Sequence, residues 1–132
     1  ELTLNAFVAA RWLLIPLQCE YYALEGVSMI MRIFNQICES EESCKLELLG
    51  VLMTMFDGRT RLSQQVVADV REYFGEKVFE TLIPRAVRLA EAPSFGKPVM
   101  YYDAYSAGTS AYSVLAEEVL SKLKIKKCKT RN

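Results

Sequence analysis

The sequence predicts an α/β fold, with a parallel β-sheet of three to four strands and helices packed against it. Short apolar runs alternate along the chain with longer segments whose apolar residues recur every three to four positions. Strands that alternate with helices form parallel sheets through right-handed crossovers. The 132 residues, 52% of them apolar, suffice for one domain with its own core.

The first strand is expected at Leu13–Leu17, a continuous apolar run typical of a strand buried on both faces. A stub of buried helix is the alternative, which Pro16 disfavours. Helical spacing predicts the next element, a helix with an apolar stripe of Val27, Ile30, Met31, Phe34, Ile37 and Cys38. The charged segment 39–45 is an exposed connection.

A second buried strand is predicted at Leu48–Phe56, followed by the turn signal Asp57-Gly58. The third strand is expected at Val78–Ile83. Two more amphipathic helices are expected, one with the stripe Leu62, Val66, Val67, Val70, Tyr73 and Phe74 and closed by Gly75, the other with Tyr112, Leu115, Ala116, Val119, Leu120 and Leu123. Three parallel strands make a thin sheet, so one of its edges is expected to need a further partner.

The segment from Ile83 to Val99 holds three prolines and three cations and is expected to be an irregular loop. It leaves the third strand at its carboxyl end. In parallel α/β sheets the ligand crevice lies at that end of the strands. The segment is therefore a candidate recognition element.

Charge is distributed unevenly along the chain, although the net charge is zero. Residues 1–121 carry 10 cations against 16 acids, and residues 122–132 carry six cations and no acid. We therefore separate a body, 1–121, from a basic tail, 122–132. The tail is either a binder of polyanions or a frayed, solubilising end.

Half of the body's cations fall in the two segments that leave the second and third strands: Arg59, Arg61, Arg85, Arg88 and Lys97. The carboxyl ends of parallel strands share one edge of a sheet, so these side chains can form one positive surface suited to phosphate. The alternative is that the arginines are solvated or pair with Asp57 or Glu91. Any nucleic-acid contact would be to the backbone and insensitive to sequence.

The sequence does not support a catalytic site, a metal site or a membrane span. The sequence has no histidine and no Gly-x-x-x-x-Gly-Lys-Ser/Thr loop, so we predict no catalytic residue and no metal site. The four cysteines, Cys19, Cys38, Cys44 and Cys128, form no C-x-x-C pair and are expected to be reduced thiols. Two acidic pairs, Glu41-Glu42 and Glu117-Glu118, are interpreted as solvated faces. Two tyrosine pairs, Tyr21-Tyr22 and Tyr101-Tyr102, are interpreted as half-buried packing rather than stacking platforms. No apolar run reaches the roughly 18 residues of a membrane span.

Three ordered motifs, Ile15–Gly26, Leu52–Leu62 and Ile83–Asp103, resemble the carboxyl-terminal half of ParA/Soj chromosome-partitioning ATPases. The similarity extends from Leu2 to Leu120. It implies a partial P-loop NTPase-like fold of the deviant-Walker, MinD-related type. It also implies a nucleoid-associated cytoplasmic protein that binds ATP and Mg²⁺ at full length, dimerises with ATP, binds DNA nonspecifically and responds to a ParB/Spo0J-type centromere-binding partner.

The resemblance also assigns residues. It implies that Thr54, Met55, Pro84, Arg85 and Val87 form a nucleotide-base pocket. It places Arg59 and Arg88 at DNA-binding positions, to which Arg61 and Lys97 are added because they belong to the same cation cluster.

The chain departs from the family pattern in two respects. Ala86 stands where the family usually has Asn, and Arg61 is an additional cation. The family's Walker A, switch and Walker B residues precede the segment matched here, and phosphoryl transfer depends on them. The chain, which starts at Glu1, resembles a piece of a longer protein and is not expected to hydrolyse ATP alone.

Two other functions were considered. One is a free-standing interaction module without ATPase activity that binds a protein through its unfilled sheet edge. The other is a MinD-like membrane-associated ATPase anchored by the tail, although Lys122–Lys127 has few apolar positions for an interfacial helix. The replicon served, chromosome or plasmid, is left open.

Overall fold

Strands and helices alternate along the chain as the sequence predicts. The computed structural model describes residues 2–40, 42 and 44–123. The elements, in order, are α1 (Leu2–Ala9), β1 (Trp12–Gln18), α2 (Ala23–Ser40), β2 (Glu47–Phe56), α3 (Arg61–Phe74), the 3-10 turn η1 (Gly75–Lys77), β3 (Val78–Pro84), α4 (Val87–Glu91), the 3-10 turn η2 (Ala92–Phe95), α5 (Val99–Tyr102) and α6 (Ala107–Lys122).

The three strands form a parallel sheet in the order β1-β2-β3, which confirms the predicted fold class. The register pairs Gln18 with Thr54 and Phe56 with Pro84, so all three strands end at the same edge. The central strand β2 is buried from Leu49 to Met53. A buried central strand is expected when helices cover both faces of a sheet.

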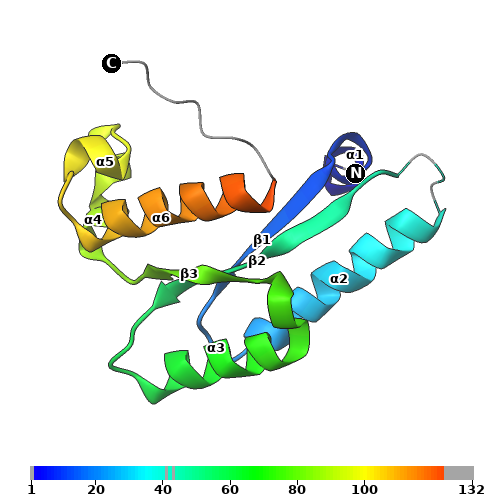
Figure 1. Cartoon of the computed structure of the whole chain (residues 1–132), viewed down its shortest axis with the longest axis horizontal. Helices are drawn as coiled ribbons and strands as arrows, with labels where there is room; N and C mark the ends of the chain where they lie inside the picture. The colour runs from blue at the N-terminus through cyan, green and yellow to red at the C-terminus, as the bar shows by residue number, and fades with distance from the viewer. Residues whose placement is uncertain (1, 41, 43, 124–132) are drawn as a thin grey trace.

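Helices α2 and α3 cover one face of the sheet and α6 covers the other, while α4 and α5 lie beyond the end of β3, beside the start of α6 (Figure 1). The larger core lies under α2 and α3 and includes Val27, Met53 and Val70. The smaller core lies under α6 and is centred on Phe79, which is fully buried. The helical stripes predicted from the sequence supply the partners on both faces.

A glycine in β2 permits a close approach between neighbouring strands. A Cβ atom on Gly50 would lie 2.5 Å from the carbonyl oxygen of Lys77 and 2.7 Å from Cε2 of Phe79. These separations are shorter than any normal contact, so only glycine fits there without movement. The β1–β2 register shifts between Leu13 and Leu14, beside this glycine.

Three expectations need correction, and one helix was not predicted. The segment 83–99 is not an irregular loop, because α4, η2 and the start of α5 occupy most of it. Tyr21, Tyr22 and Tyr101 are not half-buried but 71–79% exposed. Glu118 is not a solvated side chain, because it accepts hydrogen bonds from β3. Helix α1 was not foreseen. Most of the basic tail, residues 124–132, lies outside the described residues, and α6 runs through the expected boundary at 121/122.

Candidate functional site

The carboxyl edge of the sheet and the start of α4 enclose a cavity of about 640 Å³. Strand ends and their extensions contribute Gln18, Thr54, Met55, Ile83, Pro84 and Arg85 to its lining. The α2–α3 face adds Arg59, and the opposite side adds Ala86, Val87, Leu89, Ala90 and Tyr112. The cavity size is within the range of sites for small ligands.

The position of Arg85 is set by a continuation of the β2–β3 ladder. Its backbone N–H donates to the carbonyl oxygen of Phe56 at 2.9 Å, one residue beyond the end of β3. The chain then turns away at Ala86, which is the N-cap residue of α4 and makes no side-chain capping bond. An Asn at this position would supply the cap that alanine lacks. The departure from the family pattern therefore falls on the wall of the cavity.

Met55 adopts an unusual backbone conformation at this edge. Its φ is 54°, in the left-handed region that non-glycine residues rarely adopt, and the residue is 42% exposed. Such conformations cost on the order of 1 kcal/mol and cluster at ligand sites, where the surrounding structure imposes them. Here the ladder on both sides of β2 holds Met55 at the cavity mouth.

The cavity combines apolar walls with polar and cationic groups. Pro84, Val87 and Leu89 present apolar surface, and Val87 is 71% exposed. Thr54 and Gln18 supply hydrogen-bonding groups, and Arg59 and Arg85 supply positive charge. This arrangement suits a flat heteroaromatic group, which is apolar on its faces and polar at its edge.

A smaller hollow of about 280 Å³ adjoins the cavity and shares Met55 and Arg85 with it. Its lining is more polar and includes Asp57, Thr60 and Ser63. Thr60 caps α3 by accepting a hydrogen bond from the backbone N–H of Ser63 at 3.2 Å. The turn that follows β2 is thereby fixed to the first turn of α3.

Arg59 forms an ion pair with Asp57 at the start of this turn. Its Nη2 donates to Oδ2 of Asp57 at 2.9 Å and its Nε donates to Oδ1 at 3.0 Å. These side-chain hydrogen bonds, with a further one from the Arg59 backbone N–H, lower the pKa of Asp57 to about 2. The Arg59 side chain remains 89% exposed. It is therefore both paired and available to solvent.

Arg88 is held by two acids on the opposite side of the cavity. Its Nη1 lies 3.1 Å from Glu91 and its Nε 3.2 Å from Asp103. Tyr102 donates its hydroxyl to Glu91 at 2.8 Å, and its ring lies 6.0 Å from the guanidinium. The alternative considered from the sequence, pairing of arginines with Asp57 or Glu91, is thus present in the structure.

The structure gathers all five residues predicted for a nucleotide base, Thr54, Met55, Pro84, Arg85 and Val87, around one cavity. Of the four residues predicted to bind DNA, only Arg59 belongs to that lining. Arg61 begins α3 and Lys97 follows η2, and both are exposed. The nucleotide and DNA assignments therefore concern adjacent but different surfaces.

Six lining residues are not among the site residues predicted from the sequence: Gln18, Ile83, Ala86, Leu89, Ala90 and Tyr112. Gln18 ends β1, and the rule that ligands lie at the carboxyl ends of parallel strands could have identified it. Tyr112 comes from α6 and reaches the cavity only because that helix packs back over β3. No local signal in the sequence could have identified Tyr112.

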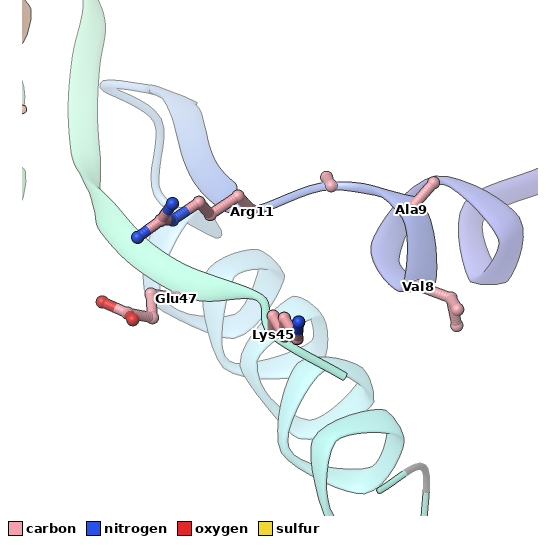
Figure 2. Close-up of a pocket in the computed structure, with 6 residues that line it drawn as sticks. Val8, Ala9, Arg11, Lys45 and Glu47 are labelled. Carbon is pink, nitrogen blue, oxygen red and sulfur yellow. The ribbon is translucent and has the colours of Figure 1, made fainter. Parts of the chain in front are cut away.

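A second cavity of about 500 Å³ lies near the amino ends of β1 and β2 (Figure 2). Val8 and Ala9 come from α1, Arg11 and Lys45 come from the segments that lead into β1 and β2, and Glu47 is the first residue of β2. Its open, mixed lining shows no convergent set of polar groups. We therefore regard the cavity at the carboxyl edge as the candidate site.

Across residues 2–40, 42 and 44–123, no group of three or more Cys, Asp or Glu side chains is placed to share a metal ion. In the same part of the chain, every helix is too short or too polar to cross a membrane.

Comparison with solved structures defines the class of protein. Cobyrinic acid a,c-diamide synthase from Mycobacterium smegmatis, solved with ADP and magnesium, superposes with a TM-score of 0.70 and 31% identity, over 94% of this chain and 43% of that one. An ATP complex of a Cyanothece McdA variant gives a TM-score of 0.74 over 92% of this chain and 46% of that one; at 20% identity it supports the fold alone. The fold is that of P-loop NTPase-like ATPases.

The sequence relatives specify the family. The chain is 51% identical over 121 residues to the chromosome partitioning protein ParA of Caulobacter vibrioides, and 52% identical over 122 residues to the chromosome-partitioning ATPase Soj of Thermus thermophilus. Each match covers 92% of this chain. An AAA domain family also matches residues 1–48. The chain is similar to ParA/Soj chromosome-partitioning proteins and matches their carboxyl-terminal half.

The chain spans less than half the length of the ParA and Soj proteins it matches. It covers 45% of the Caulobacter protein, 49% of the Thermus protein and 46% of the sporulation initiation inhibitor protein Soj of Bacillus subtilis, to which it is 48% identical.

Proposed function

We propose that this chain is the carboxyl-terminal part of a chromosome- or plasmid-partitioning ATPase of the ParA type. In this proposal it contributes one wall of the ATP site and a DNA-binding surface without sequence preference. The observation that carries the proposal is the cavity at the carboxyl edge of the sheet. It is lined by all five residues that the family resemblance assigns to the nucleotide base.

The base pocket is supported by the chemistry of the cavity. Pro84 and Val87 offer apolar surface for the faces of an adenine ring, and the Thr54 hydroxyl offers a hydrogen bond to its edge. The pocket holds no phosphate-binding glycine loop of its own. We therefore propose that phosphates and Mg²⁺ are held by groups of the full-length protein, and that this chain alone does not hydrolyse ATP.

The DNA surface is proposed to consist of Arg59, Arg61, Arg88 and Lys97. Arg59 and Arg88 are paired with carboxylates, but both pairs are exposed, and exposed ion pairs contribute only about 0–1 kcal/mol. A DNA phosphate can therefore replace a carboxylate at small cost. Release of the counterions that surround DNA then favours the exchange.

The family resemblance supplies the remaining parts of the proposal. The full-length protein would form an ATP-bound homodimer and respond to a ParB/Spo0J-type centromere-binding protein. The names of the Caulobacter and Thermus relatives, which are chromosome-partitioning proteins, support this assignment.

The base pocket is tested by placing a charge on its wall in the full-length protein. Val87→Asp puts a carboxylate against the ring and adds a cost of burying charge, so the affinity for ATP should fall at least about tenfold. Displacement of a fluorescent ATP analogue measures this affinity.

Val114→Asp is the matched control, because Val114 is also exposed, at 55%, but lies on α6 outside the cavity lining. Equal ATP affinities for the two variants would contradict the pocket assignment.

A further inference from the structure

Two cysteine side chains meet where α2 ends and the chain enters β2. The Sγ atoms of Cys38 and Cys44 are 3.1 Å apart, and both residues are half-buried. The sequence spacing of six residues gives no metal or disulfide motif. Only the fold of this connection brings the two thiols into contact.

The backbone on both sides of the pair is anchored. In the last turn of α2, the Ser40 hydroxyl donates to the carbonyl oxygen of Gln36 at 2.8 Å, and Ile37 is 8% exposed. At the start of β2, Leu46 is 6% exposed, and the backbone N–H of Glu47 donates to the carbonyl oxygen of Arg11 at 2.8 Å. Cys38 therefore lies in an anchored end of α2, and Cys44 lies two residues before the anchored Leu46.

The separation of the sulfurs is that of two free thiols in contact, because a covalent S–S bond is about 2.05 Å long. A shift of about 1 Å would allow the bond to form. By contrast, Cys19 is buried under the other end of the sheet, at 6% exposure. Within the part of the chain that the structure describes, the Cys38–Cys44 pair is thus the pair placed for this reaction.

We propose that Cys38 and Cys44 form a reversible intrachain disulfide, and that this pair is a reaction site for peroxides. The proposal is independent of the proposed ATP and DNA functions. It assigns a chemical role to a connection that lies away from the candidate site.

The reaction with a peroxide balances in two steps. The Cys44 thiolate attacks one oxygen of hydrogen peroxide, so that an S–O bond forms, the O–O bond breaks and hydroxide leaves as water. Cys38 then attacks the oxidised sulfur of Cys44: the S–S bond forms, the S–O bond breaks, and the leaving hydroxide takes the Cys38 proton to become the second water. Two thiols lose two electrons and two protons in total, and one peroxide gains them.

The order of the two steps follows from the contact itself. The hydrogen bond to Cys44, followed by burial and the charge of Cys44, raises the pKa of Cys38 to about 11. Cys38 therefore stays a thiol at neutral pH and acts as the resolving group. The thiolate is the reactive form of cysteine, so Cys38 is poorly suited to make the first attack.

The chain offers a direct assay. Trypsin cleaves after Arg32 and Lys45, and the peptide 33–45 contains both cysteines and no internal cleavage site. After peroxide treatment of the folded chain and alkylation of free thiols, this peptide should be found two hydrogen atoms lighter than its reduced form and unalkylated. Dithiothreitol should restore two alkylation sites.

The rate of disulfide formation between Cys38 and Cys44 should depend on the folded state of the chain. Disulfide formation in the native chain should be at least about tenfold faster than in the same chain unfolded in urea, because the fold holds the sulfurs together. Cys38→Ser and Cys44→Ser should each abolish the light peptide, whereas the buried control Cys19→Ser and a second control, Cys128→Ser, should retain it. If a serine variant fails to fold, the comparison of the unsubstituted chain in its native and urea-unfolded states still tests the proposal.

Three results would overturn the proposal: oxidation of Cys44 to a stable adduct that Cys38 does not resolve, a preferred bond between either cysteine and Cys128, or equal rates in the native and unfolded chains. The expected disulfide should also raise the thermal midpoint of the oxidised chain by several degrees, because the closed loop restricts the unfolded state.

Discussion

At the scale of single residues, the arginines proposed for DNA contact are partly neutralised by neighbouring carboxylates. The two-residue separation between Asp57 and Arg59 lets one carboxylate accept from both the side chain and the backbone N–H of the arginine. In the free protein this pair contributes no net charge at the edge of the sheet. Phosphate must compete with the carboxylate for Arg59.

Removal of Arg59 should release the carboxyl group of Asp57. The pKa of Asp57 is about 2 because Arg59 stabilises the charged form, first through side-chain hydrogen bonds. In Arg59→Ala, the pKa of Asp57 should rise towards the value of about 3.9 typical of an unperturbed Asp. Titration of the carboxyl carbon by NMR measures the change, and Arg61→Ala, which removes a neighbouring cation, is the control.

The sign of the pH dependence follows from the lowered pKa. Asp57 binds its proton less tightly in the folded state, so its contribution to stability is present above the unfolded-state pKa of about 3.9 and is lost as the pH falls towards 2. Solvent screens this exposed pair, so the contribution is small. An unchanged pKa in Arg59→Ala would mean that the ion pair does not persist in solution.

At the scale of elements, the position of α4 depends on a glycine in α6. A Cβ atom on Gly108 would lie 2.6 Å from Cγ of Leu89, so α6 packs against α4 only because residue 108 has no side chain. Leu89 and Val87 belong to the cavity wall. A contact between two helices, far apart in sequence, therefore shapes the candidate site.

Gly108→Ala should disturb this contact. The added methyl group must displace Leu89 or α4, and overpacking of this kind costs about 1–3 kcal/mol in the free energy of unfolding. Gly26→Ala is the matched control, since Gly26 lies in α2 with nothing within 4 Å of the added atom and should be neutral or slightly stabilising. Urea denaturation measures both variants, and equal stabilities would show that α4 is not fixed by this contact.

Helix α6 also protects the exposed edge of the sheet. The Glu118 carboxylate accepts hydrogen bonds from the backbone N–H groups of Glu80 and Thr81, both at 2.9 Å, and from the Thr81 hydroxyl at 2.7 Å. These N–H groups belong to β3, the last strand of the sheet. The Glu118 side chain thus occupies backbone N–H groups of β3 that could otherwise pair with another strand.

Glu118→Ala should lower the free energy of unfolding by about 2 kcal/mol near neutral pH, because three donors lose a charged acceptor. Burial raises the pKa of Glu118, but the hydrogen bonds and Lys122 outweigh it, and the net shift is downward. Its stabilisation is therefore present above the unfolded-state pKa of about 4.3 and declines as the pH falls through the lower folded-state pKa.

The difference between Glu118→Ala and the native chain should accordingly shrink in acid, as urea denaturation at several pH values would show. Glu72→Ala, on the exposed side of α3, should have little effect at any pH. A loss of stability that does not depend on pH would contradict a role for the carboxylate charge.

At the scale of the whole molecule, the proposed DNA surface lies on a body, residues 1–121, whose net negative charge repels DNA. Sixteen acids against 10 cations in residues 1–121 repel DNA at long range, so binding depends on the few cations at the carboxyl edge of the sheet. The proposal therefore predicts a strong effect for a small number of substitutions.

In the full-length protein, Arg59→Ala and Arg88→Ala should each weaken binding to unrelated DNA sequences alike. Each lost phosphate contact should reduce the slope of log K against log salt by about 0.9, which gel-shift titration at several salt concentrations measures. Arg32→Ala, an exposed arginine on α2, is the control. Unchanged affinity in the Arg59→Ala and Arg88→Ala double variant would exclude this DNA surface.

The sequence by itself determined the order and type of the main elements. Periodicity located the three strands and their partner helices, since buried strands and amphipathic helices each have a distinct apolar spacing. It also identified five residues that line one cavity, through a resemblance to the ParA/Soj family. It missed α4 and η2, because prolines and charges at helix ends and in loops are similar in composition.

Only the tertiary structure decided which side chains from distant parts of the sequence are in contact. It paired Arg59 and Arg88 with acids, brought Tyr112 to the cavity, placed Glu118 on the edge of β3 and joined the thiols of Cys38 and Cys44. These contacts depend on how helices cross the sheet and on the rotamers that packing permits. Apolar spacing fixes which face of an element is buried, but not which side chain of a distant element meets it.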